Sequence, residues 1–237
     1  MNIHINGILN GSSALGVLII NAIIGVYILI KAYKLGAKLL KYAGFMIILI
    51  GLLWSGPSVD FLLILFTGTN ITPTWIYAII SYIWVAPAIL LAILIGSELI
   101  APKRKKIIIS LVIIVGIVFE VGLIFFPFDG LSFNYTLPTP LGSNIIDTSL
   151  NYDFFTFYAL AIILIFVVIF NGFGSIKKAL DSTGILKRKF TYLALAFIIF
   201  PIAAVFDTLV SIAILLPIVR ITVIITGILL YLALKPE

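Results

Sequence analysis

Residues 102–127 read PKRKKIIISLVIIVGIVFEVGLIFFP, a block of basic residues followed by an apolar run from Ile107 to Pro127. At ~1.5 Å per helical residue, the run is long enough to cross the ~30 Å of hydrocarbon in a bilayer. It carries one embedded acid, Glu120. We therefore expect a membrane-spanning helix whose basic end lies at the cytoplasmic surface.

The same pattern recurs along the whole chain. The sequence is 63% hydrophobic and only 10% charged, whereas a soluble domain carries about 25% charged residues. The apolar runs predict an all-α, polytopic seven-transmembrane helix bundle in a single domain, residues 1–237. The spans are expected at about 12–31, 42–67, 74–97, 107–127, 153–173, 190–212 and 216–234. Because Pro217 suits the first turn of a helix, a tight hairpin is expected near 212–216 between the last two spans.

The basic residues give the direction of the spans. Every Lys and Arg except Arg220 falls after an odd-numbered span, in the groups 31–41, 103–106, 177–189 and Lys235. The positive-inside rule then predicts an outside N-terminus and a cytoplasmic C-terminus in the cell (plasma) membrane. Since the positive charge lies at membrane boundaries, we expect a lipid bilayer and not a nucleic acid as its partner. The connection 128–152, on the outer side, is either a cover for an outward cavity or a flexible loop.

Three N-x-[S/T] sites fall on the predicted outer side, at Asn10, Asn70 and Asn134. Glycosylation takes place on that side of the membrane. The pattern predicts a glycoprotein of an archaeal or eukaryotic cell surface.

Four charged residues interrupt the apolar runs: Asp60, Glu120, Asp207 and Arg220. Counting residues from the ends of the spans places all four roughly 9–12 Å below the outer surface. Asp207 and Arg220 are equidistant from the predicted hairpin and are expected to pair. One possibility is that the pair holds two spans together. The other is that Arg220 binds an anion or a carboxylate, and that Asp207 holds Arg220 in place when the site is empty.

The other two acids leave more alternatives. Asp60 follows Gly56-Pro57, which can kink a helix, so it either binds a cation beside freed carbonyls or is neutral and hydrogen-bonded. Glu120 is expected to be protonated, to share a hydrogen-bond network with Arg220, or to face an aqueous pocket. Tyr82 and Trp84 lie too deep for an interfacial aromatic belt and either line a ligand pocket or pack between helices. Pro87 and Pro201 are expected to kink their spans.

Several chemistries are excluded by composition. There is no cysteine, and the single histidine is His4, so a haem, an iron–sulfur cluster and a metal site are not expected. The last span contains no lysine before Lys235, which excludes a retinal Schiff base and leaves no expected cofactor. Because no nucleophile–base pair is evident, we expect a protein that is not an enzyme.

The chain resembles the seven-transmembrane sensory region found at the N-terminus of many sensor histidine kinases. The residues that carry the resemblance are Trp54, Tyr82-Ile-Trp84-Val-Ala-Pro87, Pro102-Lys-Arg-Lys-Lys106, Lys187-Arg-Lys189, Pro201, Pro217 and Gly227-Ile-Leu-Leu-Tyr231. The resemblance implies a sensor of an extracytoplasmic small molecule or of the membrane state. No kinase sequence follows up to Glu237, so the signal is expected to pass to a separate cytoplasmic protein.

Three functions remain open at this point. The first is a receptor-like sensor with an outward-facing ligand or ion site built from Asp60, Tyr82, Trp84, Glu120, Asp207 and Arg220. The second is an accessory subunit of a larger membrane or surface assembly, in which the charges only hold helices together. The third is a small transporter of protons, cations or organic anions.

Overall fold

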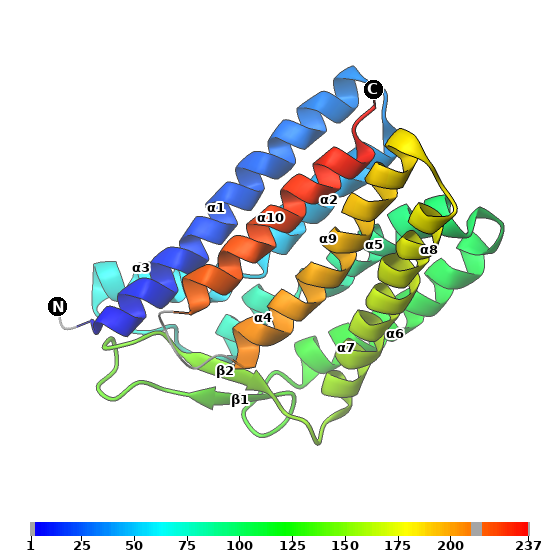
Figure 1. Cartoon of the computed structure of the whole chain (residues 1–237). Helices are drawn as coiled ribbons and strands as arrows, with labels where there is room; N and C mark the ends of the chain where they lie inside the picture. Colours follow the sequence, from blue (N-terminus) through cyan, green and yellow to red (C-terminus); the bar gives the residue numbers. More distant parts are fainter. Residues whose placement is uncertain (1–2, 210–214, 237) are drawn as a thin grey trace.

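Helices that run back and forth between two ends make up most of residues 3–209 and 215–236, the part of the chain that this computed structural model describes (Figure 1). The helices are α1 (Ile5–Lys34), α2 (Lys38–Leu52), α3 (Ser55–Thr67), α4 (Trp75–Tyr82), α5 (Val85–Ile100), the 3₁₀ turn η1 (Pro102–Arg104), α6 (Lys105–Phe125), α7 (Phe155–Phe166), the π-helical η2 (Val167–Phe173), α8 (Gly174–Leu180), α9 (Gly184–Leu209) and α10 (Leu216–Leu234). We call the two ends the hairpin end, where β1 and β2 lie, and the lysine end, where α1 turns into α2.

Six helices in the described residues are long and apolar enough to cross a membrane, and the bent pair of α2 and α3 makes a seventh if it is counted as one span. The fold is therefore the all-α bundle of a polytopic membrane protein. Each predicted span corresponds to one helix or one pair of helices. Four of the helices begin earlier than predicted: α1 at Ile5, α2 at Lys38, α6 at Lys105 and α9 at Gly184. The hairpin predicted near 212–216 falls largely on residues 210–214, which lie outside the described residues.

Small residues let α1 pack closely against its neighbours. Its buried face recurs every three or four residues and includes Gly7, Gly11, Ala14, Gly25 and Ala32. A Cβ atom on Gly25 would lie 2.8 Å from the backbone oxygen of Gly44 in α2. Close backbone approach of this kind is how helices associate in a membrane, where apolar side chains gain nothing by leaving lipid.

Two neighbouring spans are broken at the same sequence pattern, Trp54-Ser-Gly-Pro57 and Trp84-Val-Ala-Pro87. The first break bends α3 from α2 by 44°, and the second separates α4 from α5. Proline has no N–H, so the carbonyl four residues earlier, Leu53 or Ile83, loses its helical donor. A bend therefore occurs just before Pro57, and the helix is interrupted just before Pro87. By contrast, α9 continues through Pro201.

The connection 128–152 is ordered and includes the antiparallel strands β1 (Phe133–Thr136) and β2 (Asp147–Leu150), with Phe133 opposite Leu150. A second hydrophobic core, separate from that of the bundle, joins it to α3 and α4. This core consists of Phe61, Ile64, Ile71, Tyr77, Ile145 and Ile146. We call α3, α4 and residues 127–150 together the hairpin module.

Candidate functional site

The predicted pair of Asp207 and Arg220 forms. Nε of Arg220 donates to Oδ1 of Asp207 at 3.0 Å and so ties α10 to α9. The Arg220 side chain is only 5% exposed, whereas that of Asp207 is 17% exposed. The carboxylate therefore remains partly accessible while the guanidinium is buried.

Arg220 also binds α1, which the sequence did not predict. One terminal nitrogen donates to the backbone oxygen of Asn10 and to Oγ of Ser13 (2.6 Å), and the other donates to Oδ1 of Asn10 (2.8 Å). Asn10 and Ser13 lie one turn apart on α1, so both face the same guanidinium. Four N–H groups of one arginine are directed at partners, which is how a buried arginine is tolerated.

The other oxygen of Asp207 accepts a hydrogen bond from Nε1 of Trp54 at 3.1 Å. Trp54 is the residue at which α2 bends into α3. We name these five residues, Asn10, Ser13, Trp54, Asp207 and Arg220, the arginine hub. The hub connects α1, α9 and α10 to the helix break that begins the hairpin module.

Asp60 lies in a different group of contacts. Its carboxylate accepts from the backbone N–H of Ile71 (2.7 Å) and of Ile146 (2.9 Å) and from Nδ2 of Asn70 (2.9 Å). The side chain is fully buried. Three donors from the surrounding chain satisfy both carboxylate oxygens, and through them Asp60 fastens the connection 128–152 to α3.

Asn70 completes this fastening. Its Nδ2 also donates to the backbone oxygen of Asn144 (2.9 Å), and its Oδ1 accepts from the N–H of Gly142 (2.7 Å). The amides of Asn70 and Asn10 are thus engaged inside the fold, whereas Asn134 is exposed on β1. Glycosylation at these three residues stays a prediction, and Asn134 is the one whose side chain the fold leaves accessible.

Glu120 is the least satisfied of the embedded charges. Neither carboxylate oxygen has a hydrogen-bond partner among the described residues, and both oxygens are shielded from solvent. The side chain lies near the backbone of Ala86, at the start of α5, but not in hydrogen-bonding geometry. Gly116, one turn earlier on α6, packs against the same alanine.

The two predicted aromatic residues do not share a site. Tyr82 packs under the hairpin with its ring 5.1 Å from that of Phe133 and its hydroxyl beside Thr148 of β2. Nε1 of Trp84 donates to the backbone oxygen of Ile80 in its own helix, at 2.9 Å. Ser55, at the other helix break, donates to the same oxygen. Tyr82 therefore helps to hold the hairpin, and Trp84 helps to hold the two breaks together.

Tyr135 closes the hairpin from the other side. Its hydroxyl donates to the backbone oxygen of Pro127, just after α6, and its N–H donates to Oδ1 of Asp129. Burial raises the pKa of the Tyr135 hydroxyl above its ordinary value, and the nearby Tyr82 and Asp129 act in the same direction. The hydroxyl is therefore neutral and keeps its proton for this hydrogen bond.

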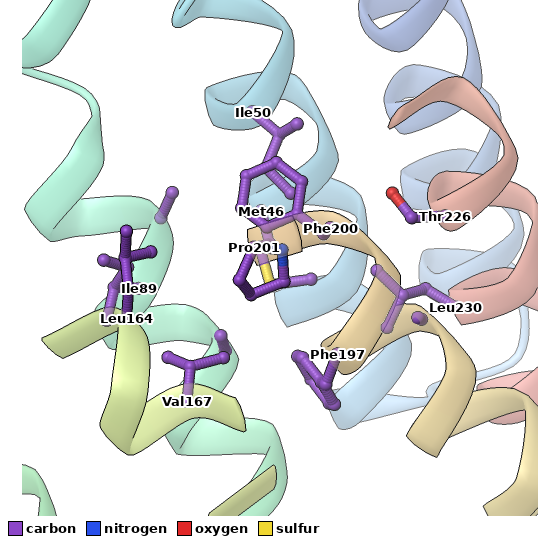
Figure 2. A pocket seen from close by; sticks show the side chains of 13 residues that line it. Met46, Ile50, Ile89, Leu164, Val167, Phe197, Phe200, Pro201, Thr226 and Leu230 are labelled. Carbon is purple, nitrogen blue, oxygen red and sulfur yellow. The ribbon is translucent and has the colours of Figure 1, made fainter. Parts of the chain in front are cut away.

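A small apolar cavity lies between α2, α5, α9 and α10 and is lined by none of the six predicted site residues (Figure 2). Its volume is about 20 Å³, room for about one water-sized sphere. Phe197, Phe200 and Pro201 of α9 line one side. The hydroxyl of Thr226 is satisfied by the carbonyl of Val223, so the cavity offers an apolar gap beside α9 and no polar ligand site.

The six predicted site residues are thus divided among separate places. Asp207 and Arg220 meet in the arginine hub, Asp60 and Tyr82 hold the hairpin module, and Glu120 and Trp84 lie near the second helix break. The residues that the sequence prediction missed are Asn10, Ser13 and Trp54. A repeated Trp-x-x-Pro pattern and two polar residues one turn apart at the start of α1 are the signals that point to them.

Among the described residues, no group of three His, Asp or Glu side chains is placed to hold a metal ion. A scan against models of known protein families finds no match for this sequence, and a search of curated proteins finds none either. The function is therefore inferred from the fold and from the arginine hub.

Proposed function

We propose that this chain is a non-enzymatic, receptor-like sensor of the cell membrane that signals to a cytoplasmic partner. In this proposal α2 and α3 form one bent span, giving seven spans with the N-terminus and the hairpin module outside. The orientation is supported by the basic residues, which gather at the lysine end.

The observation that carries the proposal is the bond between Trp54 and Asp207. Six residues form a core within the hairpin module, which also contacts the bundle core through Phe133 and Ala78. The module joins α2 and α5 through the two Trp-x-x-Pro breaks, and in this proposal it tilts about those breaks. Trp54 lies at one break and bonds to Asp207 of α9. A tilt of the module therefore changes the contact that holds the hairpin end of α9.

The hub also suggests the chemistry of a ligand. Asp207 is partly exposed, and Arg220 holds it by one Nε bond while its other donors bind α1. A small carboxylate or another anion entering from the hairpin end competes with Asp207 for Arg220. Asp207 would then be released together with Trp54, which links ligand binding to the helix break.

The signal has a path along α9. This helix runs from Gly184 at the lysine end to the hub. The small apolar gap beside Phe197, Phe200 and Pro201 lies along this path. At the lysine end, Nζ of Lys189 donates to the backbone oxygen of Lys235, so a shift of α9 also acts on the end of α10.

A spin-label distance measurement tests the proposal, because the chain has no native cysteine. Labels at Arg188→Cys and Lys103→Cys, both exposed at the lysine end, report the position of α9 relative to η1. In lipid nanodiscs we expect Asp207→Asn to change this distance by about 2 Å or more, the scale of helix shifts in switching proteins. Sodium acetate, as the probe for carboxylate ligands, is expected to move the wild-type distance in the same direction.

Two further variants separate signalling from stability. Trp54→Phe keeps the ring and removes the N–H, and should give an intermediate distance. Asp129→Asn removes a charge at the same end without touching the hub, and should change nothing. If Asp207→Asn lowers the melting temperature but leaves the label distance unchanged, the hub only holds helices together, as in an accessory subunit.

A further inference from the structure

The turn between α1 and α2 carries a dense positive charge. Lys31 and Lys34 end α1, and Lys38 and Lys41 begin α2. No acidic residue precedes Asp60 in the sequence, and the described residues form no ion pair with any of these four lysines. The neighbouring acid, Glu98 of α5, is bound by Lys105 of α6 at 2.5 Å, and Lys38 attracts it only electrostatically, without an ion pair. The four charges are therefore available to an anion from outside the chain.

Tyrosine rings hold three of the lysine side chains in place. Nζ of Lys41 lies 4.4 Å from the ring centre of Tyr33, and Nζ of Lys31 lies 5.7 Å from that of Tyr27. Lys38 makes a similar contact with Tyr42. A cation–π contact orients an ammonium group while leaving N–H donors free. The lysines are thus ordered, and their donors remain unused.

The surface beside the lysines is apolar and exposed. Tyr33 is 61% exposed, Tyr27 is 49% exposed, and Leu35 between the helices is exposed as well. Exposed tyrosines at the end of a membrane helix favour the level of the lipid head groups. A soluble anion would leave these rings in water, whereas a phospholipid covers them with its acyl chains and brings its phosphate to the lysines.

The other basic segments lack this combination. Lys103, Arg104 and Lys106 are exposed at the same end, but in the described residues cation–π contacts occur only at the α1–α2 turn. Charge alone does not separate these segments, since each has several basic residues. Exposed apolar residues also flank the other segments, for example Ile107 and Leu180, so the tyrosine contacts are what separate the α1–α2 turn from the rest.

We propose that the α1–α2 turn is a binding site for the head group of an anionic phospholipid, with Lys34 and Lys41 as principal phosphate ligands and Tyr27 and Tyr33 against the acyl chains. Each lysine near a lipid phosphate contributes about a fivefold gain in affinity. This site is independent of the arginine hub and of the proposed function.

Native mass spectrometry of the full chain in detergent tests the site, with palmitoyl-oleoyl phosphatidylglycerol as the probe and the phosphatidylcholine of the same chains as the neutral comparison. The double variant Lys34→Gln/Lys41→Gln is expected to lose about 25-fold in phosphatidylglycerol affinity. The matched control Lys103→Gln/Lys106→Gln removes two charges at the same end and is expected to stay within about twofold of the wild type.

A second variant keeps the test decisive if the double variant folds poorly. Tyr33→Leu preserves all four charges and removes the cation–π contact with Lys41, so phosphatidylglycerol affinity should fall by about threefold to fivefold. Three results would overturn the proposal. The control pair could lose as much phosphatidylglycerol affinity as the double variant, or the protein could retain both lipids equally. Millimolar inorganic phosphate or a polyglutamate peptide could also displace the lipid. Displacement by phosphate would assign the lysines to a free anion, and displacement by the peptide would assign them to an acidic protein.

Discussion

Asp60 shows how a buried carboxylate is satisfied when both of its oxygens accept hydrogen bonds. It joins the middle of α3 to residues 70, 71 and 146 through three donors. The sequence predicted the depth of this residue and left open whether it binds a cation or a neighbouring group. Only the folded position of residues 142–146 decides between them, because their amides take the place of a cation.

We predict that Asp60→Asn destabilises the hairpin module. The asparagine keeps one acceptor oxygen, which can still accept from Asn70 and Ile146, so its amide nitrogen faces the N–H of Ile71. One charge-assisted hydrogen bond is then replaced by a donor–donor contact, and the other two bonds lose their charge assistance. The expected loss is about 3 kcal/mol, seen as a lower melting temperature and as faster hydrogen exchange at residues 142–146. Asp153→Asn, at an exposed position, is the control and should leave both measurements unchanged. Normal exchange at residues 142–146 in Asp60→Asn would show that the second core alone holds the module.

The arginine hub shows which residue-level contacts a sequence can predict. Asp207 and Arg220 were paired correctly because a tight hairpin brings residues equidistant from its turn to one level. Sequence reasoning missed Trp54, Asn10 and Ser13. The depth of a residue along a helix can be counted from the sequence, whereas the side of the helix that faces a given neighbour depends on packing. The same limit explains why the four embedded charges, which were assigned to one depth, are divided among different places: Asp207 and Arg220 meet in the hub, and Asp60 and Glu120 lie elsewhere.

Among the helices, α1 allows a matched test of glycine packing. A Cβ atom at Gly25 would lie 2.5 Å from Ile48 and 2.8 Å from the backbone oxygen of Gly44, whereas one at Gly16 would meet nothing within 4 Å. We predict that Gly25→Ala costs about 1–3 kcal/mol by forcing α1 away from α2. Gly16→Ala should be neutral or stabilise by up to about 1 kcal/mol through helix propensity. Thermal unfolding in detergent measures both, and equal effects would show that α1 does not pack at Gly25 as described.

The helix breaks give a second prediction for the elements. In Pro57→Ala the restored N–H can bond to the carbonyl of Leu53, so the 44° bend between α2 and α3 should fall below about 20°. Spin labels at the exposed positions Phe45→Cys and Phe66→Cys would then move apart. Val59→Ala, on the exposed face of α3, serves as the control. A bend that persists in Pro57→Ala would mean that contacts of Trp54 and Ser55 alone set the angle.

Element prediction succeeded where hydrophobicity decides and failed where tertiary contacts do. Each apolar run corresponds to a helix or a pair of helices in the structure. The hairpin in 128–152 was left undecided because its strands are short and are held by Asp60, Tyr82 and Tyr135. The π-helical stretch Val167–Phe173 also escaped prediction. It places Asn171 so that Nδ2 donates to the backbone oxygen of Ala92 in α5, a partner that no local pattern reveals.

At the scale of the whole molecule, orientation is the property on which the proposed function depends most. An outside hairpin module can meet an extracellular ligand, and an inside lysine end can meet a cytoplasmic partner. The basic residues predict this orientation, and the fold places all three basic connections at the end opposite the hairpin (Figure 1). The two faces of the molecule therefore differ in charge as a membrane-oriented protein requires.

Single cysteines added to this cysteine-free chain make the orientation directly measurable. Thr136 is exposed on β1, and Lys178 is partly exposed at the lysine end. In intact cells, a membrane-impermeant maleimide should label Thr136→Cys, whereas Lys178→Cys should react only after the membrane is permeabilised. Phe119→Cys, fully buried in α6, controls for nonspecific reaction and should stay unlabelled in both conditions. Because the proposed ligand enters from the hairpin end, labelling of Lys178→Cys in intact cells would place that end in the cytoplasm and rule out an extracellular ligand.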